Sequence, residues 1–106
     1  MQRPVVVLMT HESVCRQKVV VNLENGLHLI PCSLIAKLAR RVNCEVTISN
    51  GRQTADAKNV LDIIALAAVQ GTELEISTSG EGAEEALASL VELFESDFQT
   101  EESGDP

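Results

Sequence analysis

The stretch NGLHLIPC, residues 25–32, lies between a run of valines and a segment with a helical pattern. Alternating apolar residues over residues 18–23 predict a strand, and Gly26 predicts a turn after it. Pro31 fits the first turn of a helix, where its missing N–H would have no partner in any case. We therefore expect a helix that begins at or just after His28.

His28 is thus expected at a helix N-terminus, beside unpaired backbone N–H groups and the positive end of the helix dipole. Such a position favours an anion, and a phosphoryl group is a good candidate. The imidazole would accept the phosphoryl group while the backbone N–H groups of Leu29 and Ile30 bind its oxygens. The alternative is a plain N-cap residue whose ring faces solvent.

The composition narrows the class of protein. The chain has 106 residues, enough for one domain, and with no Trp or Tyr and two Phe its core should be aliphatic. Eight basic and sixteen acidic residues give a charge of −8, and the sequence holds no evident basic patch. Nucleic acid and anionic membranes are therefore poor candidates for partners.

The spacing of the cysteines and the length of the apolar runs indicate in which cellular compartment the protein is expected. Three cysteines without a repeating spacing do not form a disulfide framework. The apolar run over residues 4–9 is too short to span a membrane or to act as a convincing signal peptide. We expect a cytoplasmic protein.

Apolar periodicity predicts the remaining elements. Helices are expected over residues 33–42, 60–69 and 83–94, and strands over residues 45–49, 52–55 and 73–77. Asn50-Gly51 is typical of a hairpin turn. The buried face of the first helix should consist of five apolar residues: Leu34, Ile35, Leu38, Ala39 and Val42.

The expected order is β-α-β-β-α-β-α. It fits an α+β fold in which one four-stranded antiparallel sheet is covered on one face by three helices. Residues 1–16 would form an N-terminal extension, as an extra strand or a mobile leader. Residues 17–98 would form the domain, and residues 99–106 an acidic disordered tail.

From about residue 18 to residue 98 the chain resembles HPr, the histidine-containing phosphocarrier of the phosphoenolpyruvate-dependent sugar phosphotransferase system. The resemblance rests on four matches in order: Gly26-Leu27-His28 with Pro31, Ala57-Lys58 before an apolar helix, residues 67–71 before a strand, and the loop of residues 79–82 before the last helix. It implies the open-faced HPr sandwich and a phosphoryl group carried on the δ nitrogen of His28. The implied donor is an enzyme I-like protein, the implied acceptor is an EIIA-like domain, and no cofactor is implied.

Ile30 departs from the family, which usually has arginine two residues after the histidine. An arginine there would form charge-assisted hydrogen bonds to the phosphoryl oxygens, worth about 1.5–3 kcal/mol. A bare helix terminus offers about 0.3–1 kcal/mol. We therefore expect weakened phosphotransfer and a more apolar rim. The rival function is a non-catalytic regulatory binding module.

Asn59 is the second departure, because many relatives from Gram-positive bacteria have a regulatory serine at this position. Asn59 has no hydroxyl to phosphorylate, so this regulation should be missing, although the residue can cap the second helix. Asp62 stands where the family often has glycine and adds negative charge near the surface that meets partners.

Other residues keep two interpretations. The resemblance implies a docking surface of Leu29, Ser33, Val60, Leu61 and Ile64, but helical period alone does not separate docking from core for the last three. Lys58 either is a solvated surface residue or orients partners. Cys32 either shares a metal with His28 or packs as a small residue. No third ligand is evident there, and His11 with Cys15 also supplies too few, so we expect no metal.

Overall fold

The computed structural model describes residues 14–99, so most of the expected N-terminal extension and nearly all of the acidic tail lie outside the described residues. Seven elements follow one another along the chain. They are β1 (Val14–Val20), α2 (Leu29–Ala39), β2 (Glu45–Ser49), β3 (Thr54–Asp56), α3 (Val60–Ala65), β4 (Glu73–Ser79) and α4 (Ala83–Glu95). This order confirms the predicted α+β fold.

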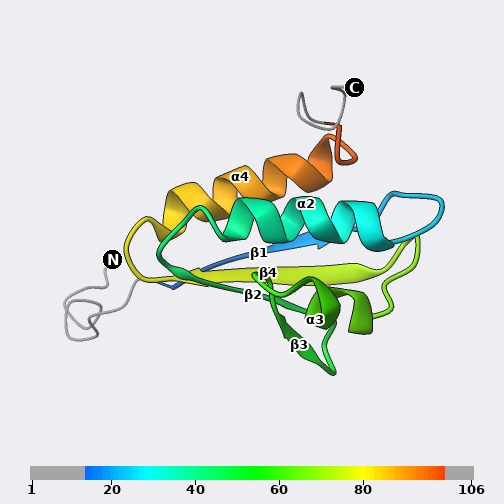
Figure 1. The fold of residues 1–106 in the computed structure, drawn as a ribbon, viewed down its shortest axis with the longest axis horizontal. Coiled ribbons are helices and arrows are strands. Elements are labelled where there is room, and N and C mark those ends of the chain that lie inside the picture. Colours follow the sequence, from blue (N-terminus) through cyan, green and yellow to red (C-terminus); the bar gives the residue numbers. More distant parts are fainter. Residues whose placement is uncertain (1–13, 100–106) are drawn as a thin grey trace, which may run out of the picture.

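The four strands form one sheet in the order β1-β4-β2-β3, and every neighbouring pair is antiparallel. Helices α2 and α4 lie along the sheet, and the shorter α3 lies beside β3 (Figure 1). No helix among residues 14–99 is long and apolar enough to cross a membrane.

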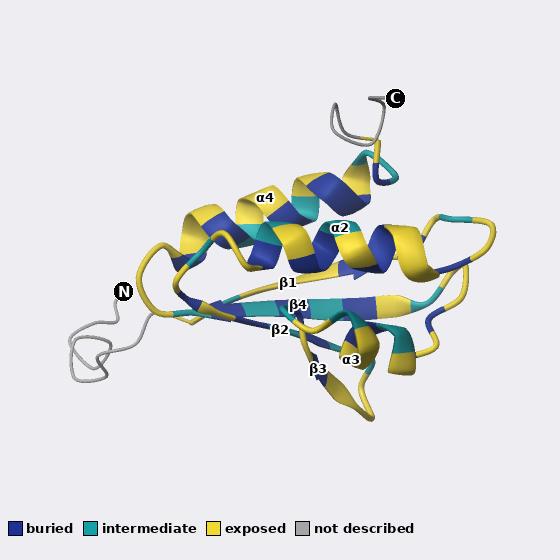
Figure 2. Cartoon of the chain, in the orientation of Figure 1, coloured by how far each residue is buried: buried dark blue, intermediate teal, exposed yellow. Residues whose placement is uncertain are grey.

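The core lies between the sheet and the helices. Buried and exposed residues alternate along the helices (Figure 2). Ile48 and Ile76 from the sheet and Ile35 from α2 are each fully buried. The core is largely aliphatic, as the composition predicts, and the two phenylalanines pack edge to face with their ring centroids 4.8 Å apart.

The first strand is offset from the prediction. It begins at Val14, opposite Ser79 of β4, and ends at Val20, so three residues assigned to the N-terminal extension belong to the sheet. Val21 remains buried and continues the contact by accepting a hydrogen bond from the amide of Gly71. The long partner strand β4 determines these limits, and the valine run alone did not reveal them.

The buried face of α2 is rotated relative to the prediction. Ile35 and Ala39 are buried as expected, but Leu34, Leu38 and Val42 are only partly buried. Their expected places facing the core are taken by Pro31, Cys32 and Ala36. Small side chains let the helix approach the sheet closely, so the larger leucines lie at its flanks.

Helix α3 ends at Ala65 and not at residue 69 as predicted. Ala67 has φ +53°, a left-handed conformation that ends the helix. The buried side chains of Leu66 and Ala68 hold the segment after the helix against the core. The left-handed conformation of Ala67 costs about 1–3 kcal/mol, and the burial of Leu66 and Ala68 on either side of it outweighs this cost.

The hairpin between β2 and β3 has a longer loop than the predicted tight turn, and β3 begins at Thr54. The Asn50 side chain organises it, because its Oδ1 accepts hydrogen bonds from the amides of Arg52 and Gln53, both at 2.8 Å. A side-chain cap of this kind stabilises a four-residue connection.

Candidate functional site

The loop before α2 is held by hydrogen bonds to its own backbone and to the segment after α3. The amide of Gly26 donates to the Leu23 carbonyl, and that of His28 donates to the Gly26 carbonyl. The amide of Leu27 donates to the Ala68 carbonyl at 3.0 Å, while the Leu27 side chain is buried. Two segments far apart in sequence thus fix the position of His28.

Gly26 is required for this approach. Its φ is +70°, and a Cβ at this position would collide with the carbonyl oxygen of Ala68. The conformation and the contact both exclude a side chain.

His28 is the N-cap residue of α2, as the sequence predicts. Its backbone is extended, with φ −86° and ψ −165°, and its carbonyl accepts the first helical hydrogen bond from the amide of Cys32 at 3.1 Å. Its side chain makes no capping hydrogen bond and is exposed. The imidazole therefore lies beside the helix terminus and does not block it.

The first amides of α2 remain available. No described residue accepts a hydrogen bond from the amide of Leu29 or Ile30, and Pro31 has no N–H. The first turn of α2 also contains no acidic side chain. Two unpaired donors at the positive end of an eleven-residue helix can bind an anion beside His28.

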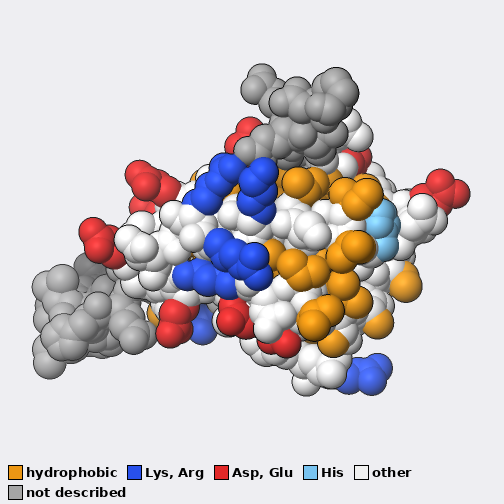
Figure 3. Space-filling view, viewed as in Figure 1, with side chains coloured by type: hydrophobic (Ala, Val, Ile, Leu, Met, Phe, Trp, Pro, Cys, Tyr) orange, Lys and Arg blue, Asp and Glu red, His pale blue; other side chains and the backbone are white. Residues whose placement is uncertain are grey.

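An apolar surface lies next to the histidine. Leu29 and Ile30 of α2 are 60% and 64% exposed, and Leu61 of α3 is 75% exposed. Val60 and Ile64 are partly buried, so they belong partly to the core and partly to this surface. Hydrophobic side chains gather beside the only histidine of the described residues (Figure 3). We call Leu29, Ile30, Leu61 and the exposed Val69 the apolar surface.

A group of basic side chains lies next to the apolar surface (Figure 3). Lys37, Arg40 and Arg41 come from the end of α2, and Lys58 comes from the loop before α3. Arg40 Nε donates to the Lys58 carbonyl at 2.7 Å, and Lys58 Nζ donates to the Val42 carbonyl at 3.1 Å. The prediction of no basic patch was wrong for this face, because the fold adds Lys58 to Lys37 of α2 and to Arg40 and Arg41, which follow the helix.

Asn59 caps α3 as predicted. Its Oδ1 accepts hydrogen bonds from the amides of Leu61 at 3.0 Å and Asp62 at 3.2 Å. The Asp62 carboxylate accepts from the amide of Asp56 at 3.3 Å. Asp62 therefore stabilises the β3–α3 loop.

Cys32 lies in the core beneath the start of α2. Its thiol donates to the Leu27 carbonyl at 3.4 Å, and burial raises its pKa to about 11. A thiol held in the protonated state is a poor metal ligand. The structure therefore favours the packing interpretation of Cys32.

Comparisons with known proteins point to one family. Residues 15–96 match the family described as PTS HPr component phosphorylation site. The phosphocarrier protein HPr of Haemophilus influenzae is 39% identical over 70 residues, which cover 66% of this chain and 82% of the relative. The phosphocarrier protein NPr of Escherichia coli K12 is 31% identical over 84 residues, which cover 78% and 93%.

Solved structures show the same fold. The crystal structure of a phosphocarrier protein HPr from Bacillus anthracis superposes with a TM-score of 0.73 at 33% identity. The match covers 77% of this chain and 98% of the other. The chain belongs to the HPr family of phosphocarrier proteins of the phosphotransferase system.

Proposed function

We propose that this protein relays a phosphoryl group through Nδ1 of His28. The observation that carries the proposal is an exposed imidazole at the N-cap of α2, beside two amides that no described residue accepts from. The amides of Leu29 and Ile30 would hold phosphoryl oxygens, while the ring supplies the nucleophilic nitrogen.

The donor is an enzyme I-like protein and the acceptor is an EIIA-like domain. A bond forms between phosphorus and Nδ1 of His28 as the bond between phosphorus and the donor's histidine breaks. The electron pair of the broken bond returns to the donor ring. In the second transfer, a bond forms between phosphorus and the acceptor's nucleophile as the bond between phosphorus and Nδ1 of His28 breaks. The electron pair of that bond returns to the His28 ring. No cofactor takes part, and positioning supplies most of the catalysis.

Both partners would dock on the apolar surface and the residues around it. Leu29, Ser33, Val60, Leu61 and Ile64 supply the contact, and the neighbouring bases favour a partner with acidic side chains. We also propose that this relay operates in the cytoplasm and without a regulatory phosphorylation at position 59, where Asn59 has no hydroxyl. Neither nucleic acid nor a membrane is a proposed partner, because the chain as a whole carries a charge of −8.

The test is incubation with phosphoenolpyruvate and enzyme I, followed by intact-mass measurement. Wild type should gain one phosphoryl group that is labile to acid, and His28→Ala should gain none. Enzyme I from the same genome is the appropriate donor, because docking is partner-specific. Modification of His28→Ala to the wild-type extent, or an unmodified wild type with several donors, would contradict the proposal.

A regulatory binding module without efficient transfer is the second candidate, favoured by the 64% exposed Ile30 side chain beside His28. Ile30→Arg distinguishes the two. A relay should gain about tenfold in phosphorylation rate, the effect of one charge-assisted hydrogen bond of about 1.5 kcal/mol. Leu29→Arg is the matched control, with the same added charge one residue earlier. A binding module would stay unphosphorylated in both variants and would bind its partner equally well after His28→Ala.

A further inference from the structure

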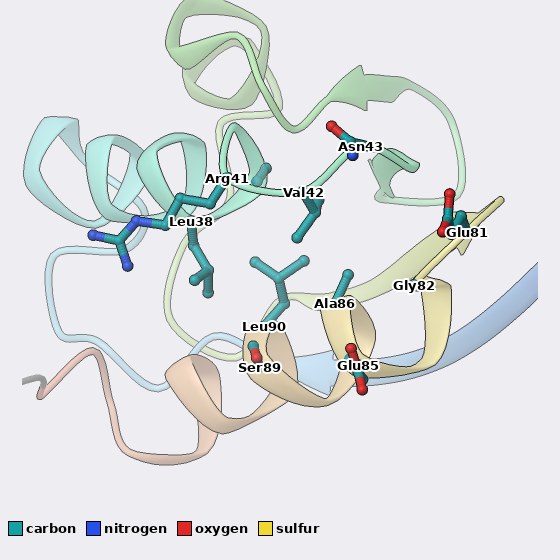
Figure 4. A pocket seen from close by; sticks show the side chains of 11 residues that line it. Leu38, Arg41, Val42, Asn43, Glu81, Gly82, Glu85, Ala86, Ser89 and Leu90 are labelled. Atoms are coloured by element: carbon teal, nitrogen blue, oxygen red, sulfur yellow. The ribbon is translucent and has the colours of Figure 1, made fainter.

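A groove lies between the end of α2 and the start of α4, at the opposite end of α2 from His28. Its volume is about 370 Å³, within the range of sites that hold ligands. Leu38 and Val42 point from the α2 side toward Ala86 and Leu90 of α4 (Figure 4). The floor is therefore apolar.

The rim of the groove is acidic on the α4 side and basic on the α2 side. Glu81 from the loop before α4 and Glu85 from the first turn of α4 line it, while Arg41 lines the α2 side. Lys37, Arg40 and Arg41 lie at the C-terminal end of α2, so the negative charge of the groove comes from the two glutamates. An occupant with an apolar body and a positive charge would complement this site.

The chain itself contains such a segment. Residues 4–9 read PVVVLM, and Arg3 precedes them as the only Lys or Arg before Arg16. We propose that residues 3–9 dock in this groove, with the valines on its floor and Arg3 beside Glu81 and Glu85. The docking is independent of the phosphoryl relay at His28.

The start of β1 lies close enough for this segment to reach the groove. Val14 pairs with Ser79, the last residue of β4, and the loop that follows Ser79 forms one end of the groove (Figure 1). Adjacent strands are about 4.8 Å apart, so Val14 lies within roughly 12 Å of Glu81. Residues 10–13 alone can extend about 13 Å.

The competing site for this segment is the free edge of β1, where it would add a fifth strand. In the described part of the chain β1 is the last strand on its side of the sheet. Its exposed Arg16 and Lys18 protect that edge and repel Arg3. The two carboxylates on the α4 side of the groove offer Arg3 a partner.

Disulfide trapping in the full-length chain tests the proposal. In a Cys15→Ser background, Val6→Cys is combined with Ser89→Cys at the groove. The matched control combines Val6→Cys with Ser33→Cys, another exposed helix serine near the far end of α2. We expect an intramolecular disulfide to form at least about tenfold faster in the Ser89 pair.

Other results would overturn the proposal. Equal rates in the two pairs would show no preference for the groove. A covalent dimer would assign the groove to a second copy of the chain. Faster trapping of Val6→Cys by Gln17→Cys would place the segment on the edge of β1.

Charge reversal tests the acidic side of the rim separately. Glu85→Lys should slow trapping about threefold, the effect of one exposed ion pair, and adding Arg3→Glu should restore the rate. Glu84→Lys, in the same turn of α4 but outside the groove, should leave the rate unchanged. Equal slowing by both lysine substitutions would contradict a role for Glu85.

Discussion

Helices α2 and α3 both begin after an extended residue, but only α3 has a side chain that accepts hydrogen bonds from its first amides. At α3 the Asn59 side chain accepts from two amides. At α2 the His28 side chain accepts from none, and the amides of Leu29 and Ile30 have no acceptor among the described residues. A side-chain cap is worth about 0.5–2 kcal/mol. The start of α2 gives up this stabilisation and remains open to an anion.

Contacts of the preceding loop with the core hold the start of α2 in place. Gly26 lets the loop approach Ala68, and the Cys32 thiol bonds to the Leu27 carbonyl. These contacts fix His28 without using its ring. Stability comes from the packed loop at α2 and from the cap at α3, and each source can be removed separately.

The largest expected effect is that of Gly26→Ala. The new Cβ meets the Ala68 carbonyl in a left-handed conformation, so we expect a loss of about 2–4 kcal/mol in the free energy of unfolding, measured with denaturant. Gly51→Ala is the matched control, because Gly51 also has positive φ but has open space around it. It should lose only about 1 kcal/mol. Equal losses would mean that the contact with Ala68 has no cost.

Cys32 gives a pH-dependent effect. Because burial raises its folded pKa to about 11, the protonated thiol stabilises the fold at neutral pH. This contribution is lost as pH rises from about 9 through 11, at about 1.4 kcal/mol per pKa unit, or about 3 kcal/mol in all. Denaturant titrations between pH 8 and 11 should show this decline in wild type. In Cys32→Ala the decline should be smaller by the same amount, and an unchanged decline would exclude Cys32 as its cause.

Removing the cap of α3 should cost less. Asn59→Ala leaves the amides of Leu61 and Asp62 without their acceptor, so we expect a loss of about 1 kcal/mol in the free energy of unfolding. Asn59→Asp retains an acceptor and should remain within a few tenths of wild type. A loss of the same size in both variants would show that the cap is not the cause.

The smallest effect is the creation of a cap at α2. His28→Asn supplies the missing acceptor, and we expect it to be more stable than His28→Ala by about 0.5–1 kcal/mol. Both variants lack the imidazole, so denaturant unfolding of the two isolates the cap. Equal stabilities would indicate that the first amides of α2 are already satisfied.

The sequence predicted the features that depend on neighbouring residues. Pro31 and Gly26 placed a helix start at His28, and Asn59 was correctly assigned as a possible cap. The order of strands and helices followed from local apolar period. Such features depend on a few adjacent residues, which can be interpreted without knowing the rest of the fold.

Only the tertiary structure determined which residues that are distant in sequence contact one another. It rotated the buried face of α2 toward Cys32 and Ala36, ended α3 at a left-handed Ala67, and brought Lys58 to the bases of α2. It also left Leu61 exposed while burying Ile63. Packing against distant segments sets these outcomes, and helical period alone allows several of them. The local pattern therefore located the histidine at an open helix terminus, whereas long-range contacts placed an apolar, partly basic surface beside it.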